Sequence, residues 1–234
     1  MFLKLTLLLA CLALTCLASP AYADKLQNDL QAWQSVAITL QPIPDKPKIK
    51  LYGQLETRQV AMLARYGQTR ARAAVGYEIL PNTEVWVGYV AAPDHQPQSD
   101  NEHRVYQQIN TSKKLLGGDL ALRTRLEQRF FSDSDPAAWR GRARLSYARP
   151  FKKGGTWYWV ASNEAFVHFD ATPSVDTGFT QNRTFVGVGR PVNQYLRMEG
   201  GYLAVLERNR TGDDDLIHAL YVGVSLNGLP GFDE

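Results

Sequence analysis

The sequence predicts an all-β fold: a single antiparallel, up-and-down transmembrane β-barrel of about ten strands, with twelve as the alternative count, after a cleaved signal peptide. Three observations support this prediction. Polar and apolar residues alternate with period two in about ten segments, the segments are long, and short turns alternate with longer polar loops. Strands that cross a bilayer need about 9 to 11 residues, whereas soluble strands average about five or six.

The N-terminal segment, residues 1–23, has the features of a secretory signal peptide. It has a positive start at Lys4, a short apolar run, and the small-x-small sequence AYA at its end. Both cysteines, Cys11 and Cys16, lie in this segment, so we expect an exported mature chain without disulfides, thiol nucleophiles or thiolate metal sites. A lipoprotein signal at Cys11 is the alternative, but it would leave an apolar core of only a few residues.

Composition narrows the class of protein. The chain carries 26 Lys and Arg against 23 Asp and Glu, a balance that does not suggest a nucleic-acid binder. Arg outnumbers Lys by 17 to 9, and Arg suits desolvated, bidentate pairing with carboxylates. No later stretch approaches the roughly 18 apolar residues of a membrane helix, so a membrane-spanning chain would have to be a closed barrel.

We expect residues 24–47 to form an N-terminal segment, 48–226 a β-barrel domain and 227–234 a C-terminal tail. A further alternating segment at 33–40 would bring the count to eleven strands, and an odd number would leave the N-terminus outside the cell. A twelfth strand in the ambiguous patch at 57–66 would restore an even number. We expect ten strands, with the 33–40 segment in the periplasm or the lumen.

The first four strands of the barrel domain are expected between residues 48 and 111. In the second of them Arg70, Arg72 and Glu78 fall on one face and small or apolar residues on the other. The fourth alternates less clearly. In order, the segments are 48–58, 70–79, 83–91 and 103–111.

Two arginine ladders come next, RTRLEQRF at 123–130 and RGRARLSY at 140–147. Charged residues occupy every second position, so they share one face of each strand, and Gly141 and Ala143 lie on the opposite face. Such ladders suit a nucleic-acid surface, a solvated soluble sheet or the inside of a membrane barrel. The barrel is favoured because interspersed carboxylates would repel phosphate and the small apolar face would make a poor soluble core.

Four more alternating segments complete the predicted barrel. They carry Glu164, Arg183, Arg197 and Glu199 on their polar faces. In order, they are 156–169, 182–190, 195–207 and 216–226.

The connections between strands alternate in length. Short periplasmic turns and longer external loops are typical of outer-membrane barrels. Aromatic residues near the strand ends would form the interfacial girdles of such a barrel. The short connections are 80–83, 150–155 and 191–194, and the long polar ones are 92–102, 131–138, 170–181 and 207–215.

The charged residues on the polar faces must point into the barrel, because an Arg or Lys on the lipid face at mid-membrane costs about 2 to 4 kcal/mol. A barrel of about ten strands is roughly filled by its own side chains, so we expect a hydrogen-bonded ion network with surplus positive charge. Such a lumen is a plug or a narrow anion-favouring path. The expected network comprises Arg70, Arg72, Glu78, Arg123, Arg125, Glu127, Arg129, Arg140, Arg142, Arg144, Glu164, Arg183, Arg197 and Glu199.

Catalytic residues are not expected. Ser162, Glu164 and His168 share one strand face, but six residues of strand separate Ser162 from His168 by about 20 Å, beyond hydrogen-bond reach. No zinc-protease or serine-hydrolase motif occurs, and we expect no metal and no cofactor. Two alternatives stay open: an outer-membrane lipid- or lipopolysaccharide-modifying enzyme that uses His168 or His103, and a soluble periplasmic β-barrel that binds a small ligand.

The ordered set HRVYQQ, LRTRLEQRF, RGRARLSYARP, SNEAFVHF, GFTQNRTFVGVGR and EGGYL resembles the bacterial family called domain of unknown function 2490, over residues 30–226. The family is regarded as outer-membrane β-barrels without an established activity, so the resemblance implies location and architecture but no catalytic residue. This chain departs from outer-membrane barrels in its predicted last strand, which ends at Leu226 rather than at an aromatic residue. The recurrent positions are Arg125, Glu127, Arg142, Arg144, Glu164, Asn182 and Arg183.

Together these observations predict a monomeric protein of the outer membrane of a Gram-negative bacterium, with a structural, narrow-transport or binding role. Its expected partners are outer-membrane lipid and, during biogenesis, the barrel-assembly machinery. Nucleic acid is not an expected partner.

Overall fold

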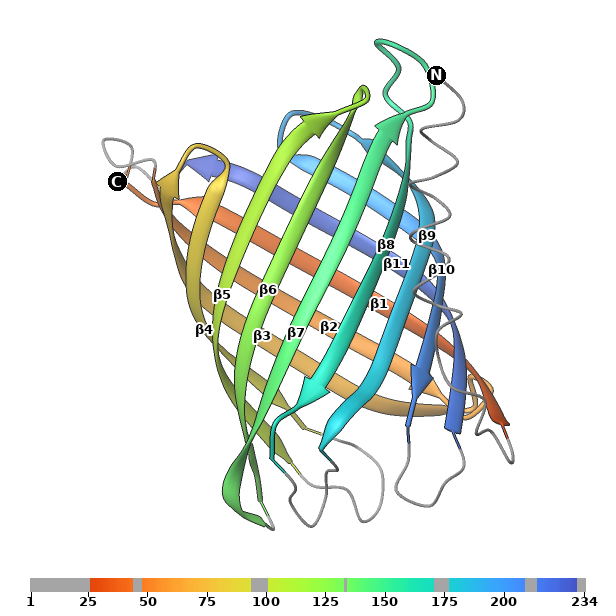
Figure 1. Cartoon of the computed structure of the whole chain (residues 1–234). Coiled ribbons are helices and arrows are strands. Elements are labelled where there is room, and N and C mark those ends of the chain that lie inside the picture. Colours follow the sequence, from red (N-terminus) through yellow and green to blue (C-terminus); the bar gives the residue numbers. More distant parts are fainter. Residues whose placement is uncertain are drawn as a thin grey trace.

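Long alternating segments become long strands that close on themselves in the computed structural model (Figure 1). The structure describes residues 26–43, 48–93, 101–132, 134–170, 177–208 and 214–230. This described part contains no helix long and apolar enough to cross a membrane. The strands are β1 (Leu26–Gln41), β2 (Ile49–Val60), β3 (Arg65–Leu80), β4 (Thr83–Ala92), β5 (Glu102–Leu115), β6 (Gly118–Phe131), β7 (Ser134–Pro150), β8 (Tyr158–His168), β9 (Gly178–Pro191), β10 (Leu196–Glu207) and β11 (Asp214–Pro230).

The barrel has eleven strands rather than ten, because β1 stands in the wall between β2 and β11. Every neighbouring pair is antiparallel except β1 and β11, which run parallel, with Val36 opposite Val224. The sheet is therefore mixed and not purely up-and-down. This closure pairs both edges of the sheet, so no strand is left with a row of unpaired backbone groups.

The patch at 57–66 does not contain a twelfth strand. It holds the end of β2, a four-residue turn and the start of β3. Ala61, Met62 and Leu63 all have positive φ, of 52°, 55° and 67°. The carboxylate of Asp29 on β1 accepts hydrogen bonds from the backbone N–H of Met62 (2.9 Å) and Ala61 (3.3 Å), which stabilises this unusual turn.

Several strands run beyond the predicted limits. Much of the predicted loop 131–138 belongs to β6 and β7, and β11 continues past Leu226 to Pro230. The predicted signal peptide and residues 94–100, 171–176 and 209–213 of the predicted long loops lie outside the described residues.

The two ends of the barrel differ. We call the turn end the one that carries the short connections β3–β4, β5–β6, β7–β8 and β9–β10 and the last residues of β11. The opposite, loop end carries the β2–β3, β4–β5, β6–β7, β8–β9 and β10–β11 connections and the first residues of β1. The strands run obliquely between the two ends (Figure 1).

Aromatic side chains point inward over glycines of the neighbouring strand. Gly88 is the cross-strand partner of Tyr106, and a Cβ on Gly88 would lie 2.5 Å from the phenol ring. Gly76 stands in the same relation to Trp86. These glycines give a large ring the space to lie flat against the wall, which fills the lumen without widening the barrel.

The outer surface carries apolar side chains from every strand, which we call the outer belt. Each member has 37–59% of its surface exposed. The belt consists of Val36, Leu55, Val75, Val87, Ile109, Leu122, Leu145, Val167, Val186, Met198 and Val222.

Candidate functional site: the charged lumen

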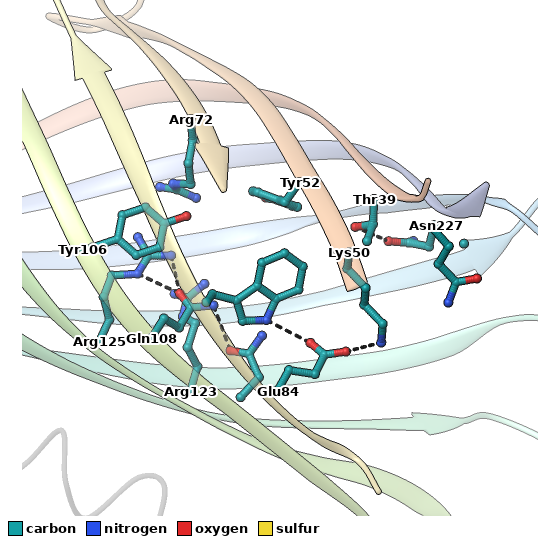
Figure 2. Close-up of a pocket in the computed structure, with 14 residues that line it drawn as sticks. Thr39, Lys50, Tyr52, Arg72, Glu84, Tyr106, Gln108, Arg123, Arg125 and Asn227 are labelled. Carbon is teal, nitrogen blue, oxygen red and sulfur yellow. Dashed lines mark hydrogen bonds and ion pairs between the residues drawn. The ribbon is translucent and has the colours of Figure 1, made fainter. Parts of the chain in front are cut away.

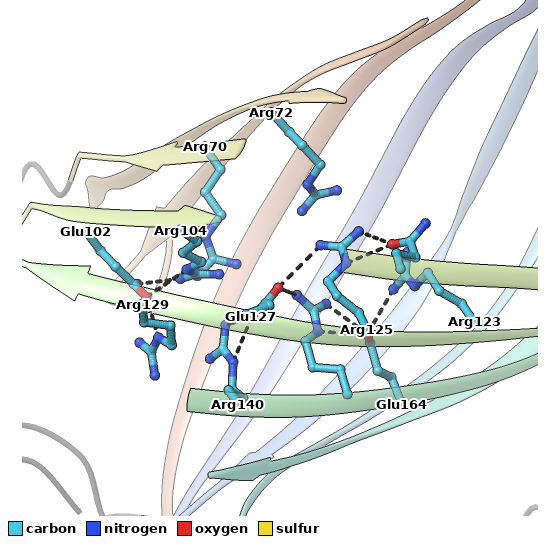
Figure 3. A network of polar contacts seen from close by, with 12 residues as sticks. Arg70, Arg72, Glu102, Arg104, Arg123, Arg125, Glu127, Arg129, Arg140 and Glu164 are labelled. Carbon is cyan, nitrogen blue, oxygen red and sulfur yellow. Dashed lines mark hydrogen bonds and ion pairs between the residues drawn. The ribbon is translucent and has the colours of Figure 1, made fainter. Parts of the chain in front are cut away.

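Glu127 on β6 is the centre of the polar network inside the barrel (Figure 3). Its side chain is 0% exposed. It accepts hydrogen bonds from Arg140 Nε (2.8 Å), Arg142 Nη1 (2.7 Å) and Arg125 Nη1 (3.3 Å). Period-two alternation places all four residues on the inward faces of β6 and β7. Glu127 is the cross-strand partner of Arg140, and Arg125 is the cross-strand partner of Arg142.

Glu164 on β8 is the second buried carboxylate. It accepts hydrogen bonds from Arg123 Nη2 (2.8 Å) and Arg142 Nε (3.0 Å). Arg142 therefore bridges Glu164 and Glu127, so that strands β6, β7 and β8 are linked through one guanidinium.

A third cluster lies nearer the loop end, around Glu102. Arg104 Nε donates to Glu102 at 2.7 Å, and Arg129 pairs with the same carboxylate. Arg129 Nη1 also donates to His168 Nε2 at 3.0 Å. Glu102 and Arg104 are only 5% and 3% exposed. Charges this deeply buried are tolerated only when they are paired and hydrogen-bonded, as these are.

Three buried glutamates thus hold six arginines, whereas Arg72, Arg144 and Arg183 have no carboxylate within ion-pair distance among the described residues. Arg72 donates to the amide oxygen of Gln54, but its Nε is buried without a hydrogen-bond partner. Arg183 lies over the rings of Phe166 (4.6 Å) and Trp33 (5.2 Å), and its Nε is likewise unpartnered. Within the described part of the chain, Arg144 has no hydrogen bond or ion pair. The lumen keeps a surplus of positive charge that its own carboxylates do not neutralise.

The space inside the barrel is distributed unevenly along its axis. A cavity of about 440 Å³ lies at the turn end (Figure 2), and a smaller one of about 160 Å³ lies deeper. Arg72 and Arg123 line both. Toward the loop end the lumen is instead filled by tightly buried side chains, so it is a recess that opens at the turn end. Among the filling side chains are Trp33, Arg58, Val90, Ala92, Glu102, Arg104, Arg129, Ala138, Arg140, Phe166, His168, Val205 and Ala219.

All fourteen residues predicted for the network lie on the inward faces of their strands, but the structure does not bring all of them together. Glu78 lies near the turn end, 3.6 Å from Lys50 Nζ. Glu199 accepts a hydrogen bond from Tyr158 (2.7 Å), and Arg197 lies 5.6 Å from the ring of the same tyrosine. Arg70 is 3.7 Å from Glu56. The remaining ten lie in or beside the clusters described above: Arg72, Arg123, Arg125, Glu127, Arg129, Arg140, Arg142, Arg144, Glu164 and Arg183.

Sequence reasoning missed Glu102 and Arg104, which pair with each other inside the barrel. The alternation of β5 is hard to see because inward Tyr106 is aromatic and outward Gln107 is polar. The repeat of charges at 102 and 104, two residues before a buried aromatic, is the signal that could have identified them.

The histidines and serine considered for catalysis do not form a site. Ser162 and His168 both point into the lumen, where His168 contacts Arg129. His103 lies on the outer surface, where its ring stacks on Tyr89 with centroids 5.8 Å apart. The wall of the barrel therefore separates His103 from the other two. In the described segments no group of three or more His, Cys, Asp or Glu side chains is placed to hold a metal ion.

Comparison with known proteins identifies the family. The family described as "Protein of unknown function (DUF2490)" matches residues 30–216. A protein of Methylorubrum extorquens that is described as uncharacterized is 29% identical over 222 residues, covering 92% of this chain and 94% of that protein. No solved structure matches the chain. The family match begins inside β1, covers β2 to β10 and ends at the start of β11, so the chain belongs to the DUF2490 family.

Proposed function

We propose that this protein is a small outer-membrane β-barrel of a Gram-negative bacterium, and that its lumen is a cation-lined recess for binding or narrow passage rather than a wide diffusion pore. The observation that carries the proposal is the outer belt combined with the charged lumen. In a water-soluble barrel the polar face would be turned toward solvent. Here the charged face is turned inward, and apolar side chains from all eleven strands face outward.

Two pairs of amide side chains on the outward face support the proposal, because the two members of each pair satisfy one another. Gln107 and Gln128 exchange amide hydrogen bonds of 3.1 and 3.4 Å between β5 and β6. Asn163 and Asn182 do the same between β8 and β9, at 2.8 and 3.2 Å. Such reciprocal pairing lowers the cost of polar groups in contact with lipid, where no water is available.

Exposed aromatic rings stand near both ends of the barrel, as the girdles of outer-membrane proteins do. At the turn end they include Tyr77 and Trp157, and at the loop end Trp139, Phe169 and Phe179. In the usual orientation, with short turns in the periplasm, the recess opens to the periplasm. The first residues of β1 then lie on the outer side of the membrane.

Fractionation tests the location. We expect the protein to stay in the outer-membrane fraction until detergent is added. We also expect the folded form to migrate faster than the boiled form in detergent gels. Release of the mature chain by osmotic shock without detergent would overturn the proposal in favour of a soluble periplasmic barrel.

Conductance tests the closed lumen. Because the loop half is filled by buried side chains, we expect the purified protein to give no steady open-channel current in planar bilayers. A persistent current that is linear with voltage would contradict a plugged lumen and indicate a diffusion pore.

A further inference from the structure

We propose that the cavity of about 160 Å³ at the inner end of the recess is a binding site for a small oxyanion, a phosphate, sulfate or carboxylate, which the guanidiniums of Arg72, Arg123 and Arg144 hold. The inference rests on the proposed function only for the side of the membrane to which the site opens. It adds to that function the chemical class of the ligand.

The charge of the cavity lining favours an anion. Six arginines and three glutamates line this cavity, a formal surplus of three positive charges. Two of the three carboxylates already serve arginines: Glu164 is bonded to Arg123 and Arg142, and Glu56 to Arg58. Glu199 accepts a hydrogen bond from Tyr158. Six guanidiniums against three carboxylates leave three positive charges in this lining that its own carboxylates cannot balance.

The position of Arg144 also favours an anion. Its cross-strand partners are Arg123 on β6 and Glu164 on β8, so a like charge stands directly opposite it on one side. Like charges opposite one another destabilise a sheet. The carboxylate opposite it on the other side, Glu164, is bonded to Arg123 and Arg142. Among the described residues, Arg144 itself has no hydrogen bond or ion pair. An anion between Arg123 and Arg144 would relieve this repulsion.

The cavity is also lined by arginines that have unused hydrogen-bond donors. The Nε atoms of Arg72, Arg70 and Arg183 are buried without hydrogen-bond partners, and all three residues line the same cavity. Buried polar atoms without partners are rare in native structures and require an explanation. Figure 3 shows Arg72 reaching from β3 into the space between the strands, across from the side that carries Arg123 and Arg125. An oxyanion accepts several hydrogen bonds at once and matches the guanidinium fork.

Size and access favour a small ligand. The cavity is about ten times the 10–15 Å³ that one water molecule requires, enough for a tetrahedral oxyanion with a few waters. The turn-end cavity of about 440 Å³ (Figure 2) shares Arg72 and Arg123 with it, so in this proposal the ligand enters from the turn end. Lys50 also lines that outer cavity but is paired with Glu84 at 2.5 Å, so the unneutralised charge lies at the inner end.

Calorimetric titration of the purified barrel in zwitterionic detergent, in a buffer without chloride, tests the site. The probes are inorganic phosphate, sulfate and succinate. We expect saturable binding of at least one probe with one site per barrel, weakening as salt is added because the contacts are ionic. Arg144→Gln and Arg72→Gln should each weaken binding about tenfold or more, since each removes a desolvated, charge-assisted contact.

Two further variants make the result decisive. Arg190→Gln removes an exposed arginine at the turn end of β9, outside the lumen, and should bind as the wild type does. Arg144→Lys keeps the charge but loses the fork, and its affinity should fall between those of wild type and Arg144→Gln. Heat-modifiable migration shows that each variant is folded. Absence of saturable binding of all three probes, or wild-type affinity in folded Arg144→Gln, would overturn the inference. Because the titration uses detergent-purified protein, it can fail independently of the membrane location.

Discussion

Replacement of Glu127 by glutamine should be among the most destabilising single substitutions in the barrel. The carboxylate is 0% exposed and accepts hydrogen bonds from three arginines. The amide of a glutamine has no charge and would direct one N–H group toward guanidinium donors. The side chain is 0% exposed, so bulk solvent does not reach it to take over the contacts.

Most of the lost stability should come from one arginine. After the substitution, Arg142 keeps its hydrogen bond to Glu164, and Arg125 keeps its hydrogen bond to the side-chain oxygen of Gln108. Arg140, however, donates both Nε and Nη2 to Glu127 and, in the part of the chain that is described, has no other hydrogen-bond acceptor. Removal of one partner of a buried ion pair costs about 3–5 kcal/mol, because the other charge stays buried and unpaired.

Urea unfolding in lipid vesicles, followed by tryptophan fluorescence, measures this difference in the free energy of unfolding. Asp119→Asn is the matched control. It removes the partner of Lys114 in an ion pair whose side chains are 84% and 55% exposed, and it should cost less than about 1 kcal/mol. Replacing both Glu127 and Arg140, the latter by methionine, should recover part of the loss, since no charge is then left without its partner.

Equal stability of Glu127→Gln and the Asp119→Asn control would refute the reasoning. It would mean that the central arginines find other partners, or water, and that the lumen is hydrated at this level.

Three other experiments test the wall of the barrel. Gly201→Ala would place a Cβ 2.3 Å from the carbonyl oxygen of residue 186 and should lower the free energy of unfolding by about 1–3 kcal/mol in the same assay. The control is Gly200→Ala, which should be nearly neutral because its Cβ would lie 3.6 Å from the nearest backbone atom. A disulfide between Val36→Cys and Val224→Cys should form and alter gel migration, and its absence would remove β1 from the wall. Val87→Arg, in the outer belt, should cost about 2–4 kcal/mol in vesicles, and a neutral effect would speak against lipid contact there.

Much of the architecture could be predicted because a strand has only two faces. Side chains alternate across the wall, so Arg123, Arg125 and Glu127 had to share a face, and a sheet with one charged and one apolar face predicted a barrel. The closing strand was harder to predict. In β1 the inward face carries Trp33 and the outward face Gln34, which weakens the contrast between the two faces. Parallel closure has no local signature in either strand.

The pairings inside the lumen could not be predicted from alternation. Which carboxylate reaches which arginine depends on register between strands, and period two leaves register open. Thus Arg142 and Arg144 look equivalent in the sequence, yet Arg142 bridges two glutamates and Arg144 reaches neither. The distinction between a structural and an available arginine, on which the proposed anion site depends, exists only in the folded barrel.

Nitroxide labels on single cysteines test the central claim most directly. The labels would be placed in turn at Val75, Val87, Leu145, Val186 and Val222 of the outer belt, with Gly154 in a turn as the reference, in barrels reconstituted into vesicles. If the belt faces lipid, all five labels will collide more often with oxygen, which concentrates in the bilayer, than with a water-soluble nickel chelate, and the reference label will do the reverse. Belt labels that collide with the chelate as often as the turn label would contradict a membrane-embedded barrel with its charges inside.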